Sequence, residues 1–374
     1  MKLLMLNYEF PPLGGGAGNA TYYLLKGFAQ RTDLSITLIT SSSGQYRQEN
    51  FSDNIKIHYL NINKQGNPHY QSLKDLIKFS LIARKFTKTL IEKEKFDLVH
   101  AFFGLPCGYL AEKLHLPYLV SLRGSDVPGY SRRFYWLEIL FFRRWNVRIW
   151  RKAKKVVANS ENLKQLAQIT APNQSIDVIP NGIDTNEFFP VAAKDSIFTV
   201  LSTSRLIERK GIICLLRGFI DFHQTSPKSR LLIVGDGPLK DQLASMIKNN
   251  NLQNSVQLLG NITHDKIQQY YQQADVFVLP SLNEGMSNSL LEAMASGLAI
   301  IATDTGGVRE LLEQDALLIE KNSSSSVANA IAKLYSQPEL LTKKKINSRR
   351  RAENYSWSKV AEKYYDLYCS IYNR

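Results

Sequence analysis

Short apolar runs alternate with helical patterns along almost the whole chain, and this alternation restricts the fold more than any other feature. Runs of this length are typical of strands buried in a parallel sheet, and the segments between them repeat apolar residues at helical spacing. The runs cover residues 3–6, 35–39, 97–101, 118–121, 156–158, 177–179, 199–204, 230–234, 256–258, 276–279, 299–302 and 317–319. We therefore expect an α/β protein with parallel sheets that carry helices on both faces.

The alternation stops once, at Pro180-Asn181-Gly182, and resumes after a polar stretch that ends near Asp195. A chain of 374 residues is long enough for about two domains, each with its own core. We predict one Rossmann-like doubly wound domain over residues 1–180 and a second over residues 181–354, followed by an amphipathic helix within 355–374. Ligands of such sheets bind beyond the carboxyl ends of the strands, so the cleft between the domains is the expected active site.

The cysteines and the apolar segments favour a cytoplasmic protein. Cys107, Cys214 and Cys369 lie far apart, without the spacing of a disulfide framework or a zinc site. The apolar run at the N-terminus is too short for a signal peptide, and no segment reaches the roughly 18 apolar residues that span a bilayer.

The net charge of +14 is concentrated in residues 130–155, which contain nine Lys or Arg residues and one acid, Glu138. Three of the four tryptophans also lie there, namely Trp136, Trp145 and Trp150. Aromatic residues recur at a spacing of three and four beside the arginines, which is typical of a basic amphipathic helix at an anionic membrane surface. Alternatively, the apolar stripe packs on the domain core while the arginines face water. No nucleic-acid-binding motif accompanies the segment, so we do not expect a nucleic-acid partner.

The segment from Asp275 to Leu311 predicts an anion pocket. A buried strand over residues 276–279 is followed by turn residues, and a helix is expected to begin near Ser287. The first N–H groups of that helix lack internal partners and carry the positive end of the helix dipole, so they suit a phosphate. Two acids spaced E-x7-E, Glu284 and Glu292, could accept hydrogen bonds from ligand hydroxyls.

A basic cluster follows another predicted strand. Arg205, Arg209 and Lys210 come directly after residues 199–204 and precede Gly211 and a helical pattern. A nucleoside diphosphate gains negative charge as its bond to a sugar breaks, so an Arg and a Lys at a strand end would lower the barrier electrostatically. A solvated basic loop is the alternative interpretation of three charges in a turn.

Taken in order, the motifs resemble those of the retaining family 4 glycosyltransferases of the GT-B fold. The matching pieces are PPLGGGAG, DLVHAFF, VVANSENL, VIPNGIDTNEF, SRLIERKG, LLIVGDGP, the E-x7-E segment and TDTGG, which together cover nearly the whole chain. The resemblance implies two Rossmann-like domains that face each other across a cleft, with the last helix crossing back to the N-terminal domain. It also implies an N-terminal acceptor domain and a C-terminal donor domain.

The resemblance assigns roles to individual residues. Arg205 and Lys210 match the pair that holds the donor diphosphate, Glu284 matches the acid that faces the donor sugar, and Glu292 matches the acid that binds the ribose. Further donor contacts are implied for the backbone near the nucleobase, the helix start and the first glycine loop, namely Ile262, Gly285, Met286, Ser287, Asn288, Gly15 and Gly16.

On the acceptor side the chain departs from the family pattern at two positions. Phe102 stands where the family often has the second histidine of VHAH, and Arg123 stands where it often has the histidine of HG-x-D. Arg123 could direct a permanent cation at a sugar hydroxyl or an acceptor phosphate, and Asp126 could orient it. We include His100 among the acceptor-side candidates, although its apolar strand setting favours a structural role.

The implied reaction is transfer of a sugar, with retention, from a nucleotide diphosphate sugar to a hydroxyl acceptor. No D-x-D motif follows a strand, so we expect neither a metal nor a cofactor. The basic segment favours a lipid-linked or envelope-glycan acceptor at the inner face of the plasma membrane. Two alternatives stay open: a GT-B nucleotide-sugar epimerase, and a non-catalytic membrane-surface protein that binds nucleotide sugars.

Overall fold

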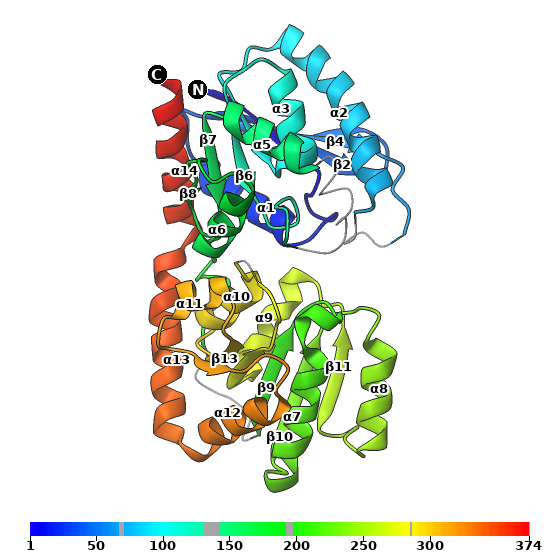
Figure 1. The fold of residues 1–374 in the computed structure, drawn as a ribbon, viewed down its shortest axis with the longest axis vertical. Helices are drawn as coiled ribbons and strands as arrows, with labels where there is room; N and C mark the ends of the chain where they lie inside the picture. The colour runs from blue at the N-terminus through cyan, green and yellow to red at the C-terminus, as the bar shows by residue number, and fades with distance from the viewer. Residues whose placement is uncertain (67–70, 131–141, 192–196, 285, 374) are drawn as a thin grey trace. The chain divides into compact units, whose positions relative to one another are not determined.

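The computed structural model describes residues 1–66, 71–130, 142–191, 197–284 and 286–373. The chain divides into two compact units, which we call unit 1 (Met1–Gly182 and Trp357–Arg374) and unit 2 (Ile183–Ser356). Each unit is a sheet between layers of helices (Figure 1).

The sheet of unit 1 has the order β3-β4-β2-β1-β5-β6-β7-β8, and its strands are parallel except β3, which runs antiparallel to β4. The strands are β1 (Lys2–Leu6), β2 (Ser35–Ser42), β3 (Arg47–Ser52), β4 (Ile55–Asn61), β5 (Leu98–Phe102), β6 (Tyr118–Leu122), β7 (Lys155–Ala158) and β8 (Asp177–Val178). The helices are α1 (Gly16–Phe28), α2 (Leu73–Lys93), α3 (Tyr109–Lys113), α5 (Arg143–Lys152), α6 (Glu161–Thr170) and α14 (Trp357–Tyr372).

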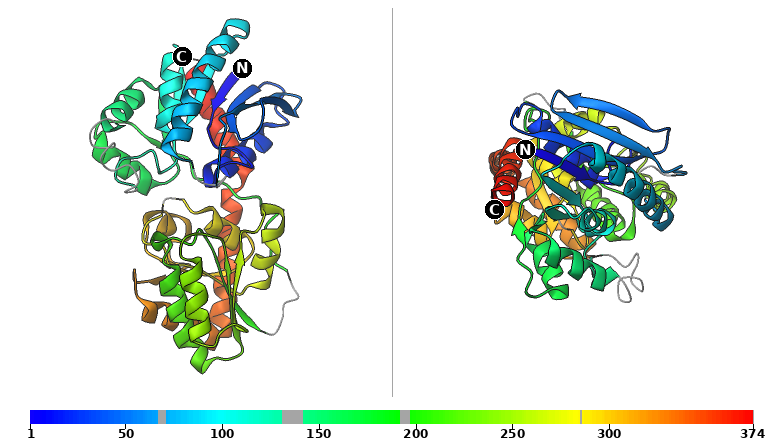
Figure 2. Two further views of the ribbon diagram at one scale, coloured as in Figure 1. Left: turned by 90° about the vertical axis from the view of Figure 1, so that its right-hand side faces the viewer. Right: turned by 90° about the horizontal axis from the view of Figure 1, so that it is seen from above.

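The C-terminal helix α14 belongs to unit 1, as expected. It lies beside α1 (Figure 2), where a Cβ added at Gly27 would stand 2.8 Å from Ala361 Cβ. Trp357 stacks on Tyr23 with ring centroids 5.7 Å apart. Its buried side chains follow the helical spacing of the predicted apolar stripe, namely Val360, Ala361, Tyr364, Tyr368 and Ile371.

The sheet of unit 2 is parallel throughout, with the order β11-β10-β9-β12-β13-β14. The strands are β9 (Phe198–Thr203), β10 (Ser229–Val234), β11 (Val256–Gly260), β12 (Val276–Leu279), β13 (Ala299–Thr303) and β14 (Leu317–Ile319). The helices are α7 (Ile212–Thr225), α8 (Lys240–Asn249), α9 (His264–Gln273), α10 (Asn288–Ala295), α11 (Gly306–Leu312), α12 (Ser324–Ser336) and α13 (Pro338–Ala352).

Successive strand residues in unit 2 point to opposite faces, and each face has its own core. In β12, for example, Val276 and Val278 pack with α7, α8 and α12, whereas Phe277 and Leu279 pack with α9, α10 and α11. Both faces are therefore apolar, which explains why the buried strands read as continuous apolar runs.

One expectation for the first sheet is incomplete, because β3 and β4 form an antiparallel hairpin that the alternation did not predict. β3 is a polar edge strand whose residues are exposed or half-buried, so it lacks the apolar run by which the other strands are found. Within the described ranges, every helix is either too short or too polar to cross a bilayer.

Candidate functional site

The strand order of unit 2 places its candidate site at a topological switch point. The chain leaves β9 for β10 and β11 on one side, and the later strands β12, β13 and β14 lie on the other side. The segments that follow β9 and β12 diverge there, so a crevice forms beyond the carboxyl ends of these two strands. Arg205 and Lys210 follow β9, and Glu284 follows β12.

Glycines allow the loops at these strand ends to approach one another closely. Gly211 has φ +67°, and a Cβ there would lie 2.1 Å from the carbonyl oxygen of Pro280. A Cβ at Gly235, with φ +133°, would lie 1.8 Å from the carbonyl oxygen of Ser204. A side chain at either position would clash with backbone, so these glycines fix the basic turn against its neighbours.

Lys210 and Glu284 form a largely buried ion pair at this edge of the sheet. Their side chains are 13% and 6% exposed, and Lys210 Nζ donates to Glu284 Oε1. Ser281 Oγ donates to the same oxygen at 2.7 Å. Burial alone would raise the pKa of Glu284, but the adjacent Lys210, Ser281 and Arg209 together lower it, so the carboxylate stays ionised.

The pair sits in an excess of positive charge. Burial lowers the pKa of Lys210, and Arg209 and Arg205 lower it further, against the opposing effect of Glu284. Arg209 Nη1 donates to the carbonyl oxygen of Asn283 at 3.1 Å, which links the two loops, and the side chain of Arg205 is exposed. Three cations beside one carboxylate favour a bound anion.

Helix α10 begins next to this cluster. Ser287 caps it, since its hydroxyl accepts a hydrogen bond from the N–H of Leu290 at 3.4 Å. Ser287 is buried, and Met286 and Asn288 are half-buried. Gly285, also expected at this site, lies outside the described residues.

Glu292, on the second turn of α10, is held by α9 and β9. Tyr271 Oη donates to Glu292 Oε2 at 2.7 Å, and Thr203 Oγ1 lies 2.6 Å from Tyr271 Oη. His264 stands on the other side, with Nε2 3.8 Å from Glu292 Oε1. Ile262, two residues before α9, is half-buried and packs against the same core.

In unit 1, the glycine loop after β1 contains two kinds of glycine. Gly14 has φ +97°, and a Cβ there would lie 2.5 Å from Glu9 Cβ, so the fold itself requires glycine. Gly15 has no heavy atom within 4 Å of an added Cβ, and its N–H donates to Glu9 Oε2 at 3.1 Å. Gly15 and Gly16 are exposed at the start of α1.

Asp126 joins the loops that follow β5 and β6. Its Oδ2 accepts from the N–H of Gly104 at 2.8 Å, and its Oδ1 accepts from the N–H groups of Arg123 at 2.9 Å and Gly124 at 3.1 Å. Burial raises the pKa of Asp126 despite these bonds.

Arg123 lies across the end of β5. Its Nη1 donates to Asn181 Oδ1 at 2.8 Å, and its guanidinium is 5.0 Å from the ring centre of Phe102. Its Nε is buried and has no hydrogen-bond partner among the described residues.

His100 is separated from the loops by its place within β5. Its Nδ1 lies 2.8 Å from Tyr368 Oη and its Nε2 lies 2.7 Å from Ser121 Oγ, and the residue is fully buried. Burial, and secondarily Arg123, lower the pKa of His100 well below its ordinary value. This histidine therefore ties β6 and α14 to the sheet, and its ring nitrogens are occupied.

Two family models together cover most of the chain: Glycosyltransferase Family 4 matches residues 14–187, and Glycosyl transferases group 1 matches residues 184–351. A putative teichuronic acid biosynthesis glycosyltransferase of Bacillus subtilis is 30% identical over 294 residues, which are 71% of this chain and 69% of that protein. The chain belongs to the family 4 glycosyltransferases.

Two further relatives of this family 4 glycosyltransferase act on lipid substrates according to their names. One of them, from the phosphatidylinositol N-acetylglucosaminyltransferase of Arabidopsis thaliana, is 24% identical over 370 residues, covering 97% of this chain and 80% of that protein. The other, the UDP-Gal:alpha-D-GlcNAc-diphosphoundecaprenol alpha-1,3-galactosyltransferase of Escherichia coli, is 27% identical over 312 residues, covering 75% and 77%.

Solved structures show the same fold. The sucrose-phosphate synthase of Thermosynechococcus elongatus superposes with a TM-score of 0.84 at 20% identity, covering 100% of this chain and 99% of that chain. An Anabaena protein in complex with UDP and glucose superposes with a TM-score of 0.74 at 22% identity, covering 99% and 100%. The family 4 glycosyltransferase thus has the GT-B fold, belongs to a retaining family and transfers a sugar from a nucleotide sugar.

The site of this glycosyltransferase contains two residues that the sequence analysis missed, Tyr271 and His264. Both lie on α9, whose sequence HDKIQQYYQQ is polar apart from single apolar positions. The one available signal was the paired Tyr270-Tyr271 on a helix directly before a buried strand.

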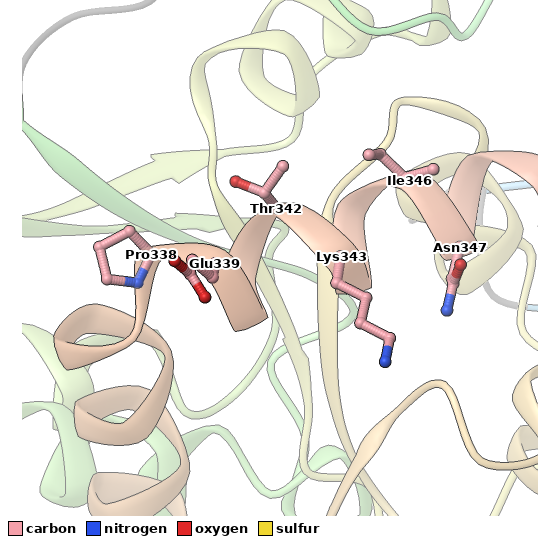
Figure 3. A pocket seen from close by; sticks show the side chains of 6 residues that line it. All are labelled: Pro338, Glu339, Thr342, Lys343, Ile346 and Asn347. Atoms are coloured by element: carbon pink, nitrogen blue, oxygen red, sulfur yellow. The ribbon is translucent and has the colours of Figure 1, made fainter.

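A shallow hollow of about 500 Å³ lies elsewhere on unit 2, along α13 (Figure 3). Its lining residues all belong to that helix: Pro338, Glu339, Thr342, Lys343, Ile346 and Asn347. Since a wall formed by one helix is open to solvent and contains no strand end, we place the donor site of this glycosyltransferase at the switch point instead.

Proposed function

We propose that this chain transfers a hexose, with retention and without a metal ion, from a nucleotide diphosphate sugar to a hydroxyl group of a lipid-linked acceptor. The observation that carries the proposal is the cluster of Arg205, Arg209 and Lys210 beside Glu284 at the switch point of unit 2. This arrangement suits a pyrophosphate next to a sugar, because cations and a single carboxylate stand side by side.

On the donor side, Arg205 and Lys210 would bind the pyrophosphate, helped by the first N–H groups of α10. Glu284, held ionised by its neighbours, would accept hydrogen bonds from sugar hydroxyls. As the sugar departs, the negative charge on the pyrophosphate grows, and fixed cations that are already in place stabilise it without reorganisation. The same cations would supply the charge that a divalent ion provides in other transferases.

On the acceptor side, unit 1 supplies Arg123 and Asp126. Asp126 holds the backbone of residues 104, 123 and 124, so it would position the arginine rather than react. The guanidinium, with its buried and unpaired Nε, would bind a phosphate or hydroxyl of the acceptor. The Arabidopsis and Escherichia coli relatives, whose names specify a phosphatidylinositol and a diphosphoundecaprenol, support a phosphate-bearing lipid acceptor.

The described part of the basic segment supports a membrane surface. Helix α5 buries Asn146, Ile149 and Trp150, whereas Trp145 is 48% exposed. The other exposed residues of this helix are cationic: Arg143, Arg144, Arg148, Arg151 and Lys152. Residues 131–141 of the predicted segment lie outside the described residues. An aromatic among exposed arginines suits the headgroup region of an anionic bilayer at the inner face of the plasma membrane.

Helix α2 extends this surface, because α3 contacts both α2 and α5 on the same side of the sheet. Ile77, Leu81 and Ile82 are 52%, 65% and 38% exposed on α2. Lys74, Arg84, Lys85 and Lys88 are exposed around them. Apolar side chains framed by cations are the composition that an anionic membrane surface favours.

The donor reaction is tested with the purified protein and a panel of nucleotide sugars, in the presence of an isolated polyprenyl diphosphate sugar or phosphatidylinositol. We expect a glycosylated lipid whose new anomeric bond has the configuration of the donor, formed equally well in the presence of a chelator. Epimerised donor without lipid product, or binding without turnover of any donor, would overturn the proposal.

The membrane surface is tested by partitioning onto vesicles of phosphatidylcholine with and without phosphatidylglycerol. Replacing Arg143 and Arg144 together by serine should weaken binding to the anionic vesicles about tenfold or more, since each cation near the surface contributes about 1 kcal/mol. The matched control replaces Lys343 and Arg350, two exposed cations of α13, and changes the net charge equally. Equal losses from both variants, or equal binding to both vesicles, would remove the membrane from the proposal.

A further inference from the structure

His264, the first residue of α9, stands between two carboxylates. Its Nδ1 lies 2.9 Å from Glu187 Oε1, and its Nε2 lies 3.8 Å from Glu292 Oε1. Phe188 is buried beneath it and packs edge-on against both its ring, at 5.5 Å, and the ring of Tyr271, at 5.7 Å. The imidazole is therefore held in place by a carboxylate on one side and an aromatic ring below.

Within the described part of unit 2, Glu292 has two neighbours that fix its carboxylate. Tyr271 Oη donates to Oε2, and Thr203 in turn lies beside Tyr271 at the end of β9. His264 faces the other oxygen. The carboxylate is 12% exposed, so it is reachable by a ligand but closely surrounded by protein.

We propose that His264 is a positioning residue for donor recognition, which holds Glu292 ionised and oriented so that it can accept hydrogen bonds from the ribose hydroxyls. This inference rests on the proposed function, in which Glu292 binds the ribose of the donor. The relay runs from Glu187 through His264 to Glu292, and Tyr271 holds the opposite oxygen.

The charge of the imidazole follows from its surroundings. Burial lowers the pKa of His264, but the hydrogen bonds and charges of Glu187 and Glu292 outweigh burial and raise it to about 10. The charged residues next to it on its own helix are Asp265 and Lys266. A permanent cation at this distance favours the ionised form of Glu292.

A purely structural role would have a different signature. The side chains of His264 and Glu187 are 33% and 28% exposed, and exposed ion pairs contribute little to stability. Removing the cation should therefore change recognition of the ribose more than folding.

The test uses whichever of UDP, ADP, GDP and CDP binds the protein best, together with its 2′-deoxy and 3′-deoxy forms. Calorimetry should show about tenfold weaker binding of each deoxy form to the unmodified protein, since a hydrogen bond to a charged group is lost. In His264→Gln this ratio should fall to about twofold, because Glu292 is no longer held, and His264→Arg, which keeps a cation, should restore part of it.

The matched control is His223→Gln on α7. His223 bonds Ser229 Oγ at 2.9 Å and contacts none of the site residues named above, so its ratio should equal that of the unmodified protein. If His264→Gln fails to fold, Glu187→Gln serves, since it leaves the imidazole in place and removes its anchor. A ratio that stays near tenfold in the folded variant would overturn the role of His264 alone. Absence of binding by all four diphosphates to the unmodified protein would instead overturn the proposed function.

Discussion

Replacing Lys210 by methionine isolates the energetics of the buried pair at the switch point. Methionine keeps an unbranched side chain of similar length but removes the cation, so Glu284 remains with Ser281 as its hydrogen-bond partner and Arg209 nearby. The carboxylate is 6% exposed and cannot be solvated in place of the lost cation.

Removing one partner of a buried pair costs about 3–5 kcal/mol, and the remaining bond from Ser281 places this case near 3 kcal/mol. Replacing Glu284 by glutamine in addition should reduce the loss to about 1 kcal/mol, because no uncompensated charge remains. The double variant should therefore be more stable than the Lys210→Met variant.

The loss should also depend on pH. In the unmodified protein the pKa of Glu284 is lowered from its ordinary 4.5, so its contribution to stability is present above that value and disappears as the pH falls through the folded value. Without Lys210, the destabilisation should be largest near pH 8 and smaller near pH 5, where Glu284 can take up a proton.

Urea unfolding followed by far-UV circular dichroism measures this loss. All four tryptophans, Trp136, Trp145, Trp150 and Trp357, lie in unit 1, so tryptophan fluorescence serves as an internal control that should not shift. A loss below about 1 kcal/mol at pH 8, or a double variant less stable than the single one, would refute the reasoning about the buried charge.

Two further predictions concern the loops and the pH response. Gly211→Ala should destabilise unit 2 by about 3 kcal/mol in the same assay, because its Cβ would lie 2.1 Å from the carbonyl oxygen of Pro280 at a positive φ. Gly15→Ala should leave thermal unfolding unchanged yet reduce sugar transfer, because the fold leaves open space there; equal effects on stability would contradict this. Donor affinity should stay constant below about pH 9 and fall as the pH passes through about 10, where His264 loses its proton and Glu292 its cation, and calorimetry across this range checks it.

The fold was largely predictable because its strands are buried on both faces. Each such strand must be a continuous apolar run, and β12 and β14 coincide with predicted runs at residues 276–279 and 317–319. The hairpin β3–β4 was not found because β3 is polar and lies at the sheet edge, where one face meets water. Edge strands lack the pattern on which the prediction relied.

The donor cluster could be predicted in part for a related reason. Arg205, Lys210 and Glu284 each follow the end of a predicted strand, and strand ends of a parallel sheet share one edge. That β9 and β12 are neighbours at the switch point is a property of the strand order, which the sequence pattern does not contain.

His264 and Trp145 show where periodicity is insufficient. Helix α9 is polar, so nothing in its pattern marks the residue that faces Glu292, and the contact exists only through tertiary packing. In α5, Trp150 lies in the core while Trp145 is exposed, although both belong to the same aromatic stripe. Spacing alone cannot decide which aromatic faces the sheet.

The central claim is that unit 2 holds a pyrophosphate between the basic turn after β9 and the start of α10. A crystal structure with the preferred nucleoside diphosphate tests it most directly. We expect phosphate oxygens within hydrogen-bond distance of Lys210 Nζ and the Arg205 guanidinium, and ribose hydroxyls on Glu292. A diphosphate bound elsewhere, with the Lys210–Glu284 pair untouched, would contradict the account.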